Sequence, residues 1–164
     1  MSQQVSFVGA GPGAADLITI RGARLLRHAD VIIFAGSLVD RELVRRYART
    51  EAVYDSAGMT LTEVITVIMD AIAAGKSVVR LHTGDPSIYG AIQEQMEALD
   101  RLGIEYEVIP GVTSAVAAPA YAGIPITHRV MKHFKRSMYH YVRRAHHRRE
   151  HVPPELAHFS HWPG

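Results

Sequence analysis

The chain of 164 residues contains no cysteine. This absence excludes a disulfide framework, a thiolate metal centre and a cysteine nucleophile. Long apolar runs are missing too, since none approaches the roughly 20 residues that a membrane-spanning helix needs. The amino-terminal segment lacks the basic and apolar regions of a signal peptide. We therefore expect a cytoplasmic protein that has no membrane partner.

The net charge is only +2, but the charged residues are unevenly distributed along the chain. Residues 1–127 carry ten Lys and Arg against fourteen Asp and Glu, whereas residues 128–164 carry eight against two, together with eight of the ten histidines. The basic character thus belongs to the carboxyl-terminal part and does not indicate a nucleic-acid partner. We predict an α/β domain over 1–127, followed by a poorly ordered, basic, His-rich tail over 128–164.

The tail suggests a metal site only weakly. His146, His147 and His151 have a spacing that can bind soft divalent ions. No second-shell partner for the imidazole rings is evident from the spacing. We therefore predict that the protein holds no metal.

Short apolar runs alternate with amphipathic segments along the domain. The expected strands are residues 5–8, 31–34, 52–54, 76–81 and 104–109. The expected helices begin at Asp16, after Leu38 and at Thr60, and two more cover residues 89–102 and 113–121. This alternation predicts an open parallel five-stranded sheet with helices on both faces.

Three details of these elements can be read from local signals. Asp16 is a candidate N-cap for the first helix, and Thr60 with Glu63 has the spacing of a capping box. In the last strand, Glu105 and Glu107 alternate with apolar residues, which suggests one wet face. We place that strand near an edge of the sheet.

Glycine and proline gather at three places where a strand ends, in residues 8–13, 82–90 and 108–114. Open α/β sheets bind their ligands at the carboxyl ends of strands, so these corners predict a small-molecule site. The first corner lacks the Gly-x-Gly-x-x-Gly spacing, and Pro12 removes an N–H that a pyrophosphate would use. A nucleotide-dependent oxidoreductase is therefore disfavoured.

The second corner contains an aspartate in a defined conformation. Pro86 biases Asp85 toward an extended backbone, which fixes the direction of its carboxylate. That carboxylate can accept a hydrogen bond from a ligand, or it can cap a helix beginning near Ser87. We expect the preceding His82 to be a satisfied residue at a strand end rather than an acid or base.

The third corner offers hydroxyl groups and backbone N–H groups at a helix start. Thr113 and Ser114 suit a ligand carboxylate or the edge of a base. Ordinary N-capping by Thr113 explains this corner nearly as well.

Four segments follow one another in an order that resembles the tetrapyrrole methylases, a family of S-adenosylmethionine-dependent enzymes. They are residues 8–13, 16–22, 35–39 and 81–90, and the resemblance extends over about residues 4–116. Within the family, residues 35–39 and 82–95 are most similar to the branch that methylates precorrin-4 or cobalt-precorrin-4 at C11 in cobalamin synthesis.

The resemblance implies a site for S-adenosyl-L-methionine. Carried over to this sequence, the residues that contact it are Pro12, Thr83, Gly84, Asp85, Ile88, Thr113 and Ser114. The implied substrate is a tetrapyrrole with several carboxylates, for which exposed arginines such as Arg80 or Arg21 are candidate partners. The implied assembly is a homodimer. No catalytic residue is identified, because the donor is already activated and positioning can carry most of the rate.

The resemblance changes after residue 116. Residues 117–129 resemble the uroporphyrinogen-III C-methyltransferase branch, and the tail after them resembles neither branch. Family members also have a second α/β domain that closes over the donor. Three interpretations stay open: a precorrin-4 C11-methyltransferase, a uroporphyrinogen-III C-methyltransferase, or a truncated, non-catalytic binding or assembly module with half a cleft.

Overall fold

The computed structural model describes residues 4–88 and 90–127. Its elements, in chain order, are β1 (Val5–Gly9), the 3-10 helix η1 (Ala15–Leu17), α1 (Ile20–His28), β2 (Val31–Phe34), α2 (Arg41–Tyr47), β3 (Val53–Asp55), α3 (Leu61–Ala73), β4 (Val78–His82), α4 (Gln93–Leu102), β5 (Tyr106–Ile109) and α5 (Ser114–Tyr121). Residues up to 117 form a first compact unit, and the described residues 118–127 belong to a second. All of these strands and α1 to α4 lie in the first unit.

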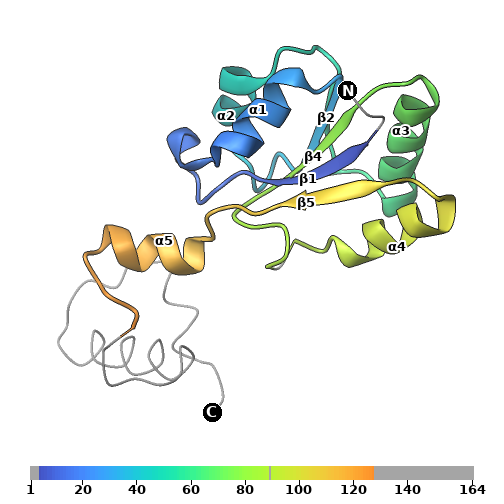
Figure 1. Cartoon of the computed structure of the whole chain (residues 1–164). Coiled ribbons are helices and arrows are strands. Elements are labelled where there is room, and N and C mark those ends of the chain that lie inside the picture. Colours follow the sequence, from blue (N-terminus) through green and yellow to red (C-terminus); the bar gives the residue numbers. More distant parts are fainter. Residues whose placement is uncertain (1–3, 89, 128–164) are drawn as a thin grey trace. The chain divides into compact units, whose positions relative to one another are not determined.

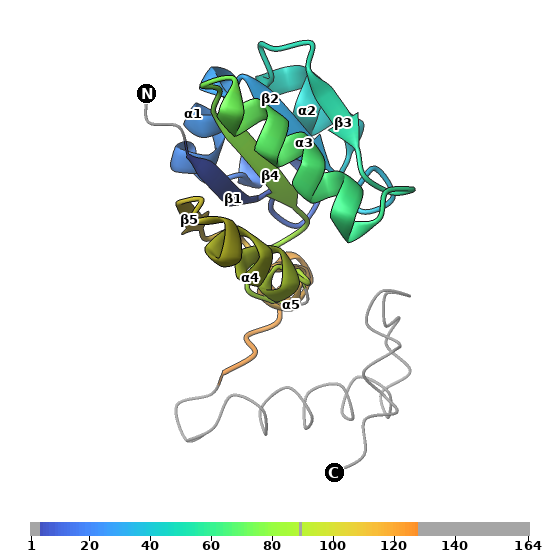
Figure 2. The same ribbon diagram turned by 90° about the vertical axis from the view of Figure 1, so that its right-hand side faces the viewer.

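The five strands form one parallel sheet in the order β3-β2-β4-β1-β5. Helices α1 and α2 cover one face, and α3 and α4 cover the other (Figures 1 and 2). The predicted open parallel sheet with helices on both faces is confirmed. From β1 the chain crosses toward β2, whereas from β4 it crosses the other way, to β5. A reversal of this kind opens a crevice at the carboxyl ends of the strands.

Each face of the sheet has its own apolar core. Leu26 of α1 and Leu43 of α2 are buried in one core, and Ile68 of α3 and Leu99 of α4 are buried in the other. Each such side chain contributes about 1.5–3 kcal/mol to folding through its removal from water. All four residues of β2 are buried because this strand contacts both cores, as its continuous apolar sequence predicts.

The capping box predicted for the third helix is present, but the cap predicted for the first helix is wrong. In α3, Thr60 Oγ1 accepts from the Glu63 N–H at 3.3 Å, and Glu63 Oε2 accepts from the Thr60 N–H at 2.7 Å. Asp16 lies within η1 instead of capping α1. Thr19 caps α1 by accepting from the Gly22 N–H at 3.1 Å.

Helix α4 begins later than the predicted range of 89–102. The backbone of Ala91 has a φ of +46°, a left-handed conformation that a continuous helix does not allow. Ile92 then stands at the N-cap without a side-chain hydrogen bond. The other end is as expected, because Gly103 terminates α4 with a φ of +66°.

Strand β5 lies at an edge of the sheet, as predicted. Its two faces are less distinct than the alternating sequence suggests. Glu107 is half-buried and accepts a hydrogen bond from Ser6 Oγ at 3.0 Å. Val108, on the opposite face, is 36% exposed. Because both faces of an edge strand meet solvent along part of its length, polarity alone does not identify the wet face.

Candidate functional site

Three loops meet at the carboxyl ends of the adjacent strands β4, β1 and β5. We call them the first loop (residues 10–14), the second loop (83–88) and the third loop (110–113). The first and second are joined by an antiparallel bridge, in which the Gly11 N–H donates to Gly84 O at 3.2 Å and the Gly84 N–H donates to Gly11 O at 2.8 Å. The expectation that these loops lie at one sheet edge is confirmed.

Glycine is required where the loops cross. A Cβ on Gly9 would lie 2.5 Å from the Cα of Gly111, and a Cβ on Gly111 would lie 2.0 Å from the carbonyl oxygen of Gly84. Both distances are far below van der Waals contact, so no side chain fits at either position. Gly84 has a φ of +60°, which disfavours any other residue. The three backbones thus approach one another as closely as they can.

The Asp85 carboxylate joins the second loop to the third. Its Oδ2 accepts from the Gly111 N–H at 2.9 Å. Its Oδ1 accepts from the Ser87 N–H at 2.8 Å and also from the Ser87 hydroxyl. Partial burial raises the pKa of Asp85, but the hydrogen bonds from Ser87 and Gly111 outweigh burial and leave this pKa below its ordinary value. No helix begins at Ser87, so the alternative of a helix cap is wrong.

We call the place where the three loops meet the three-loop junction. Three other predicted site residues lie on the first and second loops of this junction. Pro12 is half-buried in the first loop, next to the bridge. Thr83 is exposed, and the side chain of Ile88 is 43% exposed. Together they provide hydroxyl and apolar groups on two of the three loops.

The last two predicted residues lie where the third loop meets α5. Thr113 is half-buried, and its Oγ1 accepts from the Ala115 N–H at 3.4 Å, which confirms the capping alternative. Ser114, the first residue of α5, is exposed. A Cβ on Gly84 would lie 3.6 Å from the Thr113 Cα, so this cap faces the second loop directly.

Arg80 and His82, at the end of β4, are both buried; the burial of Arg80 was not expected, and the expectation that His82 is fully satisfied is wrong for its Nε2 atom. Arg80 is 7% exposed, and its Nε donates to Gln95 Oε1 at 3.0 Å. Among the described residues, the NH1 group of Arg80 and the Nε2 atom of His82 have no hydrogen-bond partner. The prediction of an exposed Arg80 is wrong, because β4 is a central strand covered by α4; Arg21 is exposed on α1. The alternation of Arg80 and His82 with valine and leucine predicts a strand with one wet face, so the sequence carried no signal for this burial.

The environment of His82 keeps its imidazole neutral. Burial, followed by repulsion from Arg80, lowers the pKa of His82 to about 3, and a backbone hydrogen bond with Gly90 opposes this shift only partly. Burial lowers the pKa of Arg80 to about 10, so its guanidinium stays charged near neutral pH. An imidazole with so low a pKa is a poor acid or base near pH 7.

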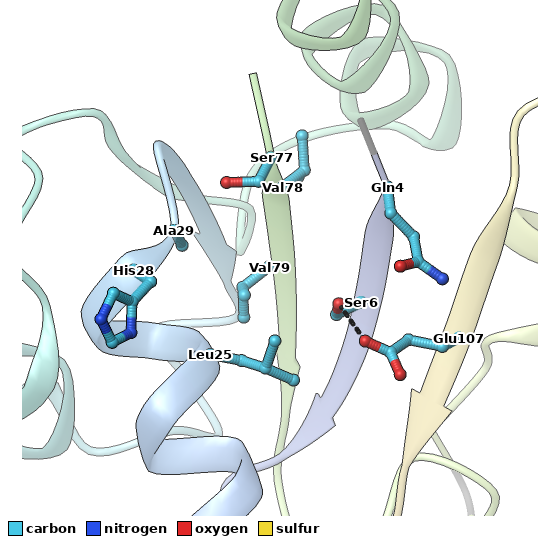
Figure 3. A pocket seen from close by; sticks show the side chains of 9 residues that line it. All are labelled: Gln4, Ser6, Leu25, His28, Ala29, Ser77, Val78, Val79 and Glu107. Carbon is cyan, nitrogen blue, oxygen red and sulfur yellow. Dashed lines mark hydrogen bonds between the residues drawn. The ribbon is translucent and has the colours of Figure 1, made fainter. Parts of the chain in front are cut away.

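A hollow of about 210 Å³ lies at the opposite end of the sheet (Figure 3). Its lining comes from α1, the segment after it, and the amino-terminal parts of β1, β4 and β5: Gln4, Ser6, Leu25, His28, Ala29, Ser77, Val78, Val79 and Glu107. None of the predicted site residues lines it. The hollow is therefore separate from the junction of the three loops.

Two further observations concern only residues 4–88 and 90–127. No helix in that part is long and apolar enough to cross a membrane. No group of three or more His, Asp or Glu side chains there is placed to hold a metal ion. The tail predicted over 128–164, with His146, His147 and His151, lies outside the described residues.

The fold and the junction define an α/β domain in which three strand-end loops converge at a topological switch point, the place where open sheets of this kind bind ligands. The chain belongs to the Tetrapyrrole (Corrin/Porphyrin) Methylases, whose family model matches residues 4–155.

Individual relatives agree with this assignment. The chain is 51% identical over 126 residues to a cobalt-precorrin-4 C(11)-methyltransferase of Methanocaldococcus jannaschii, an alignment that covers 77% of this chain and 49% of the relative. It is 47% identical over 116 residues to a precorrin-4 C(11)-methyltransferase of Mycobacterium tuberculosis, covering 71% of this chain and 46% of the relative. The chain thus spans about half the length of the curated relatives it matches.

Solved structures of related methyltransferases agree with the family assignment. A cobalt precorrin-4 methyltransferase superposes with a TM-score of 0.73 at 46% identity, covering 77% of this chain and 53% of that one. A uroporphyrin-III C-methyltransferase from Thermus thermophilus, complexed with S-adenosylhomocysteine, gives a TM-score of 0.65 at 38% identity, covering 79% and 56%.

Proposed function

We propose that this chain is the S-adenosylmethionine-binding half of a methyltransferase that methylates precorrin-4 at C11 in corrin synthesis. The convergence of the three loops carries the proposal, because the family resemblance assigns the methyl donor to residues of these loops. The contacting residues in this proposal are Pro12, Thr83, Gly84, Asp85, Ile88, Thr113 and Ser114. Identity of up to 51% to C11-methyltransferases supports the choice of branch.

The residues of the junction fit a donor that has no phosphate. Pro12 lacks the N–H that would help to cradle a pyrophosphate. Exposed Thr83 and Ile88 offer one polar and one apolar contact. Gly84 leaves open the space beside Thr113 that a Cβ would fill. Such a mixture suits a nucleoside joined to an amino acid.

Chemically, the site has to position the methyl donor rather than activate it. The bound donor would supply a methyl group on a sulfonium, from which the neutral thioether S-adenosylhomocysteine departs as a good leaving group. The loops would hold that methyl in line with the electron-rich ring carbon and exclude water. His82 takes no part as a proton carrier in this proposal, since its pKa of about 3 keeps the imidazole neutral.

Isothermal titration calorimetry with S-adenosylhomocysteine tests the donor site. We expect the full 164-residue chain to bind it at a single saturable site and to bind neither NAD nor ATP. Absence of S-adenosylhomocysteine binding would favour the assembly module. Micromolar binding of NAD would mean that the first loop has been misassigned.

A second candidate, uroporphyrinogen-III C-methylation, has one observation in its favour. The chain is 46% identical over 132 residues to a siroheme synthase of Klebsiella pneumoniae. Competition between the two tetrapyrroles for the S-adenosylhomocysteine-loaded protein separates the branches, and we expect the precorrin to bind more tightly. The homodimer and the absence of a nucleic-acid partner stay predictions, which light scattering and DNA titration can test.

A further inference from the structure

We infer that Asp85 is a positioning residue, whose carboxylate fixes the third loop against the second instead of contacting the methyl donor. This inference rests on the proposed function, since the loops matter here as the donor site. It assigns the donor contact at Asp85 to the backbone, not to the side chain.

The contacts of the carboxylate carry the inference. Both of its oxygens already accept hydrogen bonds from the protein, Oδ1 from Ser87 and Oδ2 from the Gly111 N–H at 2.9 Å. Ser87 lies two residues away, so that contact only shapes the second loop. Gly111 lies in a different loop, so the contact with it links two segments that the chain brings together from far apart.

The position of Gly111 makes this link consequential. Its backbone is in tight contact with Gly84, whose carbonyl oxygen would lie 2.0 Å from a Cβ on Gly111. Contact at such close range resists compression but does not stop the loops from separating. The Asp85 hydrogen bond supplies the missing attraction. Thr113 follows two residues later, so its placement depends on this link.

The protonation state of Asp85 agrees with such a role. Partial burial raises its pKa, but hydrogen bonds from Ser87 and Gly111 lower the pKa further, so the carboxylate is ionised near neutral pH. The shift has no contribution from a charged side chain. An ionised acceptor makes a stronger hydrogen bond to a backbone N–H than a neutral one does.

Asp55, at the end of β3, provides a matched control. Its Oδ1 accepts from the backbone N–H groups of Gly36 at 2.9 Å and Ala57 at 3.0 Å, and its Oδ2 accepts from Arg41 at 2.8 Å. The chemistry therefore resembles that of Asp85. However, β3 is the far edge strand of the sheet and contributes nothing to the three-loop junction.

The test compares Asp85→Asn and Asp55→Asn in the full chain by calorimetry with S-adenosylhomocysteine. An asparagine accepts only at Oδ1, so Asp85→Asn keeps the backbone hydrogen bond from Ser87 or the one from Gly111 but not both, and solvent exchange of the Gly111 amide shows which one is lost. We expect the substitution to weaken binding by about 10- to 100-fold, the range for a hydrogen bond to a charged group. Asp55→Asn should leave the affinity unchanged. Equal affinities for the wild type and an Asp85→Asn variant whose Gly111 amide exchanges faster would overturn the inference while leaving the proposed function intact.

A measurement without ligand separates positioning from direct contact. In the wild-type protein, the NMR signal of the Gly111 amide should shift with the acid titration of Asp85, and in Asp85→Asn this amide should exchange faster with solvent. A Gly111 signal that does not respond to that titration would overturn the inference, even if Asp85→Asn failed to fold. Failure of the wild type to bind S-adenosylhomocysteine would instead contradict the proposed function.

Discussion

The backbone of Gly111 has no room for even a methyl group. A Cβ there would lie 2.0 Å from the Gly84 carbonyl oxygen. We expect Gly111→Ala to push the second and third loops apart, to lower the free energy of unfolding by about 2 kcal/mol and to abolish S-adenosylhomocysteine binding. Urea denaturation and calorimetry measure the two effects.

Gly58→Ala is the control for this substitution. A Cβ on Gly58 would meet no atom within 4 Å, and its φ does not lie in the left-handed range. We expect its free energy of unfolding to stay within about 0.5 kcal/mol of the wild-type value. Similar decreases in the free energy of unfolding of Gly111→Ala and Gly58→Ala would show that the close contact between the second and third loops is not the source of the strain.

Buried His82 should make stability depend on pH. Its folded-state pKa of about 3 lies below the ordinary value of 6.5, so the unfolded chain binds this proton more readily. The stabilising contribution is complete above about pH 6.5 and falls as pH drops toward 3, by at most about 1.4 kcal/mol per pH unit. Urea midpoints at pH 7, 6 and 5 should therefore fall less steeply for His82→Gln than for the wild type. Parallel slopes would contradict the burial of a neutral imidazole.

Residues whose roles are local could be predicted, whereas those with distant partners could not. The glycine and proline corners are visible in the sequence because they reflect backbone demands of a few neighbouring residues. The partner of Asp85 could not be found this way, because Gly111 lies in another loop. Arg80 was predicted to be exposed on the basis of its charge, but a central strand under α4 buries it.

At the scale of elements, the capping box of α3 makes a prediction of definite sign. Thr60→Ala removes the acceptor for the Glu63 N–H at an exposed helix start. We expect the free energy of unfolding to fall by about 1 kcal/mol, as measured by urea denaturation.

Thr66→Ala in the same helix is the matched control. The Thr66 hydroxyl donates to the Thr62 carbonyl oxygen at 2.9 Å, a bond that competes with the helix instead of starting it. Because alanine is the better helix former, this variant should be as stable as the wild type or slightly more stable. A loss as large as that of Thr60→Ala would mean that the cap has no special role.

The start of a helix could be predicted only where the sequence offered a single capping signal. The capping box of α3 had no rival nearby. In α1, however, both Asp16 and Thr19 can cap, and the 3-10 turn η1 takes up the first of them. In α4, the positive φ of Ala91 delays the start of the helix, and residue propensities do not report such a backbone conformation.

At the scale of the whole molecule, the property to predict is how fast the 164-residue polypeptide transfers a methyl group. The chain spans about half the length of its curated relatives, whose names refer to methyl transfer onto precorrins. We expect the 164-residue polypeptide to bind S-adenosylhomocysteine but to transfer little methyl to precorrin-4, because it spans only about half of the length over which its relatives enclose their reactants. Mass spectrometry of the acceptor measures this, with the M. jannaschii relative as the active control. Methyl transfer at a rate comparable to that of the relative would contradict this expectation.

The fold class could be read from the alternation of strands and helices, but most of the strand order could not. Glu105 and Glu107 suggested an edge for the last strand, and β5 is indeed an edge strand. Nothing local shows that β1 lies between β4 and β5, because that arrangement depends on the direction of each crossover.

The position of β1 has a consequence for biosynthesis. Val5 pairs with Val78 on one side and with Tyr106 on the other. The ribosome therefore makes this strand well before either neighbour; one of its hydrogen-bonding edges stays open until β4 (Val78–His82) is made, and the other until β5 (Tyr106–Ile109) is made. Nascent chains of this protein should accordingly depend on holding chaperones until β5 has left the exit tunnel.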